Sequence, residues 1–63
     1  MKLPGGQKIW VTIRDERGRE KWIIASEPAR VNYILYEVRG GKLEKVKVSK
    51  NPGDFERITG VRT

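Results

Sequence analysis

The sequence predicts an all-β fold, a single domain of five short antiparallel strands joined in a meander. Three observations lead to this fold class. β-branched and aromatic residues alternate with polar ones over short stretches. Glycine and proline recur between these stretches, where tight turns need them. No segment of about twelve residues has the periodicity of a helix.

The first hairpin is predicted at residues 8–26. "KIWVTIR", Lys8–Arg14, alternates β-branched residues with others, which is typical of a strand. Asp15–Arg17 fit a type I turn, and Gly18 fits the left-handed residue of a bulge. The partner strand is "REKWIIAS", Arg19–Ser26.

The second hairpin begins after Pro28, which cannot donate a hydrogen bond to a sheet. "VNYILYEVR", residues 31–39, is the third predicted strand, and Gly40 and Gly41 suit a two-residue turn. The fourth strand is "GGKLEKVKVSK", residues 40–50, in which Lys45 and Lys47 alternate with valines.

The carboxy-terminal residues follow "NPGD", where Pro52 and Gly53 fit a type II turn. We expect "FERITGVRT", residues 55–63, to form a fifth strand, with a single helical turn and an extended end as the alternative. A sheet of this size must curl to cover its apolar face. The prediction is therefore a small SH3-like or OB-like barrel, with an open sheet as the alternative.

The register of each hairpin decides which side chains are buried. In the first hairpin we expect the pairs Asp15–Arg19, Val11–Ile23 and Ile9–Ala25. One face then carries Ile9, Val11, Ile13, Ile23 and Ala25, and the other carries Trp10, Thr12, Arg14, Trp22 and Ile24. The first set is small, branched and uncharged, as a core requires.

In the second hairpin, a two-residue turn pairs Arg39–Lys42, Leu35–Val46 and Tyr33–Val48, and sets Glu37 against Glu44. The opposite face would hold Ile34, Tyr36, Val38, Leu43, Lys45 and Lys47. A three-residue loop would instead place Leu35 beside Lys45. The first register is preferred because it keeps every lysine out of the core.

Residue types missing from the chain argue against several classes of function. The 63 residues include no cysteine and no histidine, so we expect no disulfide, no metal site of the usual zinc type and no cofactor. Apart from the adjacent Asp15 and Glu16, which we expect at a solvated turn, the acidic residues are scattered singly, and no glycine-rich phosphate-binding fingerprint is present. The sequence therefore predicts a protein that is not an enzyme.

The net charge of +6 predicts a polyanionic partner, most often nucleic acid. An anionic membrane surface, or charge that serves solubility alone, are the other interpretations. No apolar run reaches the length of a membrane span, and "MKLPGGQK" lacks the apolar stretch of a signal peptide. We therefore expect a cytoplasmic location, with residues 1–7 as a flexible basic segment.

The candidate nucleic-acid site combines cations with flat rings, which contact phosphates and stack on bases. The candidate residues are Lys42, Lys45, Lys47, Lys50, Tyr36, Arg14, Trp10 and Trp22. Contacts mainly to phosphates predict little sequence specificity, on either DNA or RNA. The alternative is a protein-interaction adaptor that uses an exposed apolar surface drawn from Trp10, Trp22, Ile24 or Leu43.

In size, charge, lack of cysteine and predicted barrel, the chain resembles the small basic chromatin proteins of thermophilic archaea, and equally small accessory ribosomal proteins. Its scarcity of heat-labile residues beside abundant Lys, Arg and Glu is also typical of thermophile proteins. The resemblance is one of class, since no residue motif of either group is present. It implies a nucleic-acid partner and transfers no site residue.

Overall fold

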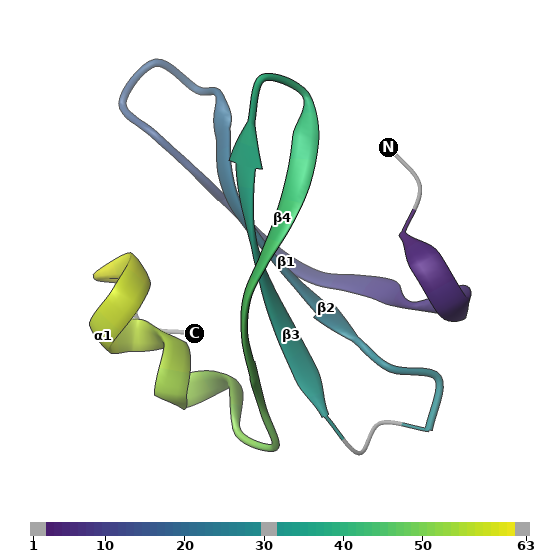
Figure 1. The fold of residues 1–63 in the computed structure, drawn as a ribbon. Coiled ribbons are helices and arrows are strands. Elements are labelled where there is room, and N and C mark those ends of the chain that lie inside the picture. The colour runs from purple at the N-terminus through teal and green to yellow at the C-terminus, as the bar shows by residue number, and fades with distance from the viewer. Residues whose placement is uncertain (1–2, 30–31, 62–63) are drawn as a thin grey trace.

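Four antiparallel strands in one sheet form most of the molecule. The computed structural model describes residues 3–29 and 32–61. Figure 1 shows the strands as one strongly twisted sheet, in the order β1–β2–β3–β4. The elements are the 3-10 turn η1 (Pro4–Gly6), β1 (Lys8–Arg14), β2 (Glu20–Ser26), β3 (Tyr33–Arg39), β4 (Lys42–Ser49), the 3-10 turn η2 (Pro52–Phe55) and the helical turn α1 (Glu56–Thr59). The predicted β meander is confirmed for these four strands; Val31, predicted to begin the third, lies outside the described residues.

The sheet of the described residues is open and has four strands, so the predicted closed barrel and fifth strand are not found there. Strands β1 and β4 are its two edges. Residues 55–59, expected in the fifth strand, complete η2 and form α1. Gly60, with a φ of 75°, ends this helical turn, and its N–H donates to the carbonyl of Glu56 at 2.7 Å. Arg62 and Thr63, the end of the predicted strand, lie outside the described residues.

The turn before η2 also differs from the prediction. The side chain of Asn51 accepts a hydrogen bond from the backbone N–H of Gly53 at 2.9 Å and caps the start of η2. Gly53 does not have the positive φ that a type II turn requires. The local cap of Asn51 therefore directs the chain into a helical turn and away from a second pass along the sheet.

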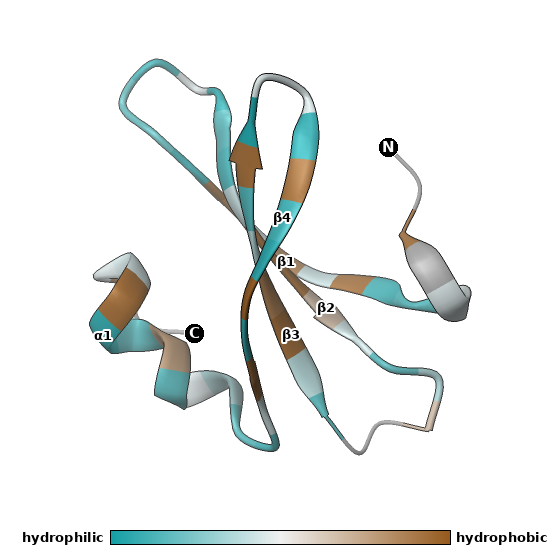
Figure 2. Ribbon diagram, viewed as in Figure 1, coloured by the Kyte–Doolittle hydropathy of each residue, from teal (hydrophilic) through white to brown (hydrophobic). Residues whose placement is uncertain are grey.

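Apolar side chains gather on both faces of the sheet. In Figure 2 the hydrophobic residues lie along the strands, while the loop between β1 and β2 is hydrophilic. The first face buries Ile13, Ile24, Leu35 and Phe55, with Val11, Trp22 and Tyr33 packed beside them. The second face buries Ile23, Ala25, Ile34 and Tyr36, with Leu3, Val38 and Leu43 packed beside them. One sheet cannot shield both of these small cores from water, so side chains from outside the strands must pack on each face.

The two ends of the described chain supply these side chains. Phe55, from η2, is fully buried in the first face. Leu3 packs on the second face, where the hydroxyl of Tyr36 donates to the side-chain carbonyl of Gln7 at 2.8 Å. Leu3 and Gln7, from the predicted flexible segment, thus contact the sheet. Figure 1 shows the carboxy-terminal turns and the amino-terminal turn on opposite sides of the strands.

The turn of the first hairpin forms as predicted. The N–H of Asp15 donates to the carbonyl of Arg19 at 2.9 Å, and Gly18 has a φ of 77°. The carboxylate of Asp15 also accepts from the backbone N–H of Arg17 and of Arg19, at 2.9 and 3.0 Å. This single side chain therefore organises the loop.

The predicted register of this hairpin is only partly correct. Ile9 pairs with Ala25 as expected, but Val11 pairs with Ile24 and not with Ile23. The reason is a β-bulge, since Trp10 is an extra residue between the two pairs.

One extra residue exchanges the faces of everything beyond it. Val11 and Ile13 therefore share the first face with Trp22 and Ile24, while Ile23 lies on the second. A second bulge at Lys21, between the pairs Ile13–Trp22 and Arg14–Glu20, restores the alignment at the turn.

Phe55→Ala is expected to destabilise the protein by about 3–5 kcal/mol, because it removes a buried aromatic ring and leaves a cavity. That is a large share of the roughly 5–15 kcal/mol available to a small domain. Urea denaturation followed by circular dichroism measures the loss. Ile58→Ala, on the exposed side of α1, is the control and should cost less than about 1 kcal/mol. Equal losses in the two variants would contradict the central role of Phe55.

Candidate nucleic-acid interface

Strand β4 carries a series of lysines along one edge of the sheet. The turn before it contains Gly40 and Gly41, with φ of 54° and 79°, and pairs Arg39 with Lys42 as predicted. The lysines are Lys42, Lys45 and Lys47 within the strand and Lys50 just after it. All four are exposed.

Lys45 and Lys47 do not share one face of the sheet, contrary to the prediction. Tyr36 pairs with Lys45, but its neighbour Leu35 pairs with Lys47, so Val46 is the extra residue of a third bulge. Cross-strand partners share a face, and successive residues of a regular strand alternate. Lys45 therefore lies on the second face beside Tyr36, and Lys47 on the first face beside Leu35.

The predicted pairs beyond this bulge are shifted too. Tyr33 pairs with Ser49 and not with Val48, which pairs with Ile34. Val48 thus lies on the second face, and Lys47 takes the place on the first face that the prediction gave to Val46. The bulge moves Val46 out of the ladder, where its side chain is 43% exposed.

Few of the basic side chains are neutralised by carboxylates. All the lysines and arginines that the structure describes are exposed. Within residues 3–29 and 32–61, Arg39 alone forms ion pairs, through Nε to Glu37 at 2.8 Å and to Glu44 at 3.7 Å. Glu37 and Glu44 face each other as predicted, and Arg39 offsets their repulsion. The β4 lysines thus keep their charge available.

The ring of Tyr36 is not on the surface. Its residue is 6% exposed, and its hydroxyl is bonded to Gln7. Tyr36 was predicted to stack beside Lys45 and Lys47, but it packs in the second core and is paired across the strands with Lys45 only. Burial explains the difference, because the amino-terminal residues lie over this face.

The two tryptophans occupy different surroundings. Trp10, in its bulge on β1, is 55% exposed and meets Tyr33 edge to face, with ring centroids 5.5 Å apart. It borders a hollow of about 350 Å³ that Lys8 also lines. Trp22 is half-buried against the first core and borders a different hollow together with Arg14. Arg14 and Trp22 therefore line the same hollow, whereas Trp10 lines a different one.

Some residues near these sites were not predicted. Arg57 and Lys47 line one hollow of about 420 Å³ beside η2, together with Asp54. Asp54 already accepts a hydrogen bond from the hydroxyl of Ser49. Arg17 and Lys21 lie with Trp22. Their proximity depends on the helical turns and on the bulge at Lys21, neither of which hydrophobic periodicity reveals.

No family model, curated protein or solved structure matches this chain. In the described part of the chain, no cluster of acidic side chains is suited to hold a metal ion. That part also contains no helix of the length and apolar character needed to cross a membrane.

Deletion of Val46 is expected to change the free energy of unfolding by no more than about 1 kcal/mol. The pairs on both sides of the bulge, Tyr36–Lys45 and Leu35–Lys47, then join in a regular ladder. Had the strand been regular, the deletion would move every later residue of β4 to the opposite face and cost more than about 1 kcal/mol. Urea denaturation separates these outcomes, and nuclear Overhauser contacts between residues 35 and 47 check the register.

Proposed function

We propose that the protein binds nucleic acid, without catalytic activity, through phosphate contacts along the β4 edge. The observation that carries this proposal is the set of exposed, unneutralised lysines on one edge strand. A net charge of +6 in 63 residues adds a long-range attraction for polyanions.

The bulge at Val46 makes the edge, and not one face, the natural contact surface. Lys45 and Lys47 project to opposite faces, so a phosphate backbone that follows the edge meets cations from both sides. From Lys42 to Lys50 the chain extends about 26 Å at the usual rise of a strand. That matches about eight phosphates on one strand of a B-form duplex.

Protection against aggregation is the competing explanation for lysines on an edge strand. Both edges of this sheet already carry a bulge, at Trp10 in β1 and at Val46 in β4. Only β4 has lysines in its interior, whereas the charged residues of β1 are its end residues, Lys8 and Arg14. This asymmetry favours a binding role for the β4 lysines beyond edge protection.

Phosphate contacts position a protein on nucleic acid but do not read its sequence. The proposed partner is therefore DNA or RNA of any sequence, as for a chromatin or ribosome-associated protein.

An adaptor function is the second candidate, and exposed Trp10 and Ile9 on β1 favour it. Of the other residues predicted for such a surface, Ile24 is fully buried, and Trp22 and Leu43 pack against the two cores. The candidate adaptor surface thus shrinks to the start of β1.

Binding of duplex DNA should weaken steeply with salt, and Lys45→Ala/Lys47→Ala should reduce the slope of log affinity against log salt by about two. Each lysine contributes one released counterion, although the two lie on opposite faces. Fluorescence anisotropy of a labelled duplex at several salt concentrations measures the slope.

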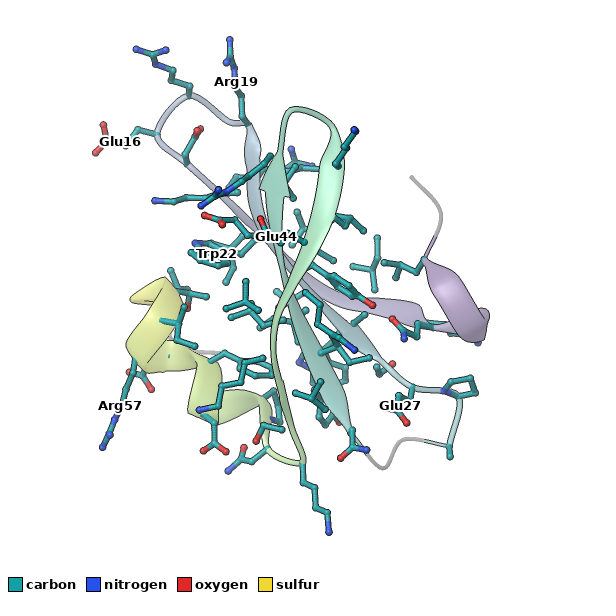
Figure 3. The ribbon with its side chains drawn as sticks, in the orientation of Figure 1. Glu16, Arg19, Trp22, Glu27, Glu44 and Arg57 are labelled. Atoms are coloured by element: carbon teal, nitrogen blue, oxygen red, sulfur yellow. The ribbon has the colours of Figure 1, made fainter. Side chains whose placement is uncertain are left out.

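The matched control is Lys8→Ala/Arg19→Ala, which removes the same two charges away from β4. Figure 3 shows Arg19 pointing away from the sheet at the first hairpin turn. Its slope should stay within experimental error of the parent protein. Equal reductions in both double variants would contradict a localised interface, and no binding at low salt would reject the proposal in favour of the adaptor.

A further inference from the structure

An open hollow of about 580 Å³ lies between the first hairpin and the end of the helical turns. Its volume is within the range of about 300–1,000 Å³ that ligand sites occupy. Apolar and aromatic atoms of Ile13, Trp22 and Val61 line it, and Arg14, Arg17 and Lys21 contribute charge. The hollow therefore combines a flat ring with cations.

Trp22 is the aromatic element of this hollow. It sits opposite Ile13 on the first face and packs beside the core that Phe55 closes. Figure 3 shows its side chain directed into the space between the strands and α1. Because one part of the indole is held by the core and another is accessible, it offers a rigid stacking surface.

The hollow has two acidic residues, Asp15 and Glu16, fewer than its three cations. The carboxylate of Asp15 accepts the backbone N–H groups of Arg17 and Arg19. Glu16 points outward from the tip of the hairpin (Figure 3). In the described part of the chain neither carboxylate forms an ion pair.

The cationic side chains of the hollow differ in whether a hydrogen bond within the protein holds them. Nη1 of Arg14 donates to the carbonyl of Gly18 at 3.0 Å, so this guanidinium is held in place beside the turn. Arg17 and Lys21 are exposed, and among the described residues neither forms an ion pair. These two are the cations best placed to contact a phosphate.

We infer that this hollow receives an unpaired base of a single-stranded nucleic acid, with the base stacked on Trp22 and its flanking phosphates on Arg17 and Lys21. The inference rests on the proposed function and adds to it a preference for single strands. In a duplex the base faces are covered by their neighbours, so only an unpaired base can reach the indole. The hollow beside Trp10 offers one lysine, Lys8, and is the weaker site.

Single-tryptophan variants locate the stacking. Trp10→Phe leaves Trp22 as the only indole, and Trp22→Phe leaves Trp10. Titration with an oligothymidine of about eight nucleotides should quench the fluorescence of Trp10→Phe and leave that of Trp22→Phe nearly unchanged. Quenching in Trp22→Phe alone would place the base at Trp10 and overturn the inference.

Affinity measurements test the same site without relying on fluorescence. Trp22→Leu should weaken oligothymidine binding about tenfold and duplex binding less than twofold, because stacking is lost only for unpaired bases. Since Trp22 also packs against the core, Arg17→Ala/Lys21→Ala provides a surface variant that should lower the affinity for oligothymidine more than that for the duplex. Lys8→Ala/Arg19→Ala is its charge-matched control.

The outcomes separate this inference from the proposed function. If Lys45→Ala/Lys47→Ala reduces the salt slope on duplex DNA, but both hollow variants affect single and double strands equally, the inference alone is rejected. If the slope is unchanged by the β4 substitutions, the proposed phosphate interface is rejected whatever Trp22 does.

Discussion

The burial of Phe55 in the first face is the interaction on which the rest of the structure depends. A chain of 63 residues has only a small core, and its single sheet has apolar side chains on both faces. Phe55 closes the first face from outside the sheet, while Leu3 and Gln7 contact the second. Because residues 52–59 form η2 and α1 and shield this face, they do not pair with β4. That strand remains an edge whose lysines are accessible.

The sequence was sufficient to predict four strands and the turns of the two hairpins, because alternation and glycine positions are local signals. "KIWVTIR" is a strand from Lys8 to Arg14, as predicted. The face of the sheet on which each side chain lies could not be predicted in the same way. Each bulge inserts one residue, and Trp10, Lys21 and Val46 look like any other position in an alternating stretch. Only pairing across the strands determines which residue is extra.

Bulges and long-range contacts, which the sequence does not reveal, also affect the candidate site. The β4 lysines were located on one strand from the sequence alone, yet Lys45 and Lys47 lie on opposite faces. Tyr36 was predicted beside both lysines but pairs with Lys45 alone, and its hydroxyl bonds to Gln7, 29 residues away in the chain. In the tail, Asn51 and Gly60 are recognisable as cap residues. The β-branched residues after Phe55 nevertheless favoured a strand, and the helical turn is too short to show a period.

An open sheet leaves two edges, and in this molecule they differ in chemistry. The β4 edge is cationic on both faces, whereas β1 presents exposed Trp10 and Ile9 between its terminal charges. A closed barrel would have paired β1 with a later strand and removed this difference. The bulge at Val46 then determines the form of the cationic surface, since it divides the lysines between the faces. The phosphate interface that we propose therefore follows the rim of this sheet, because small apolar cores lie on both of its faces.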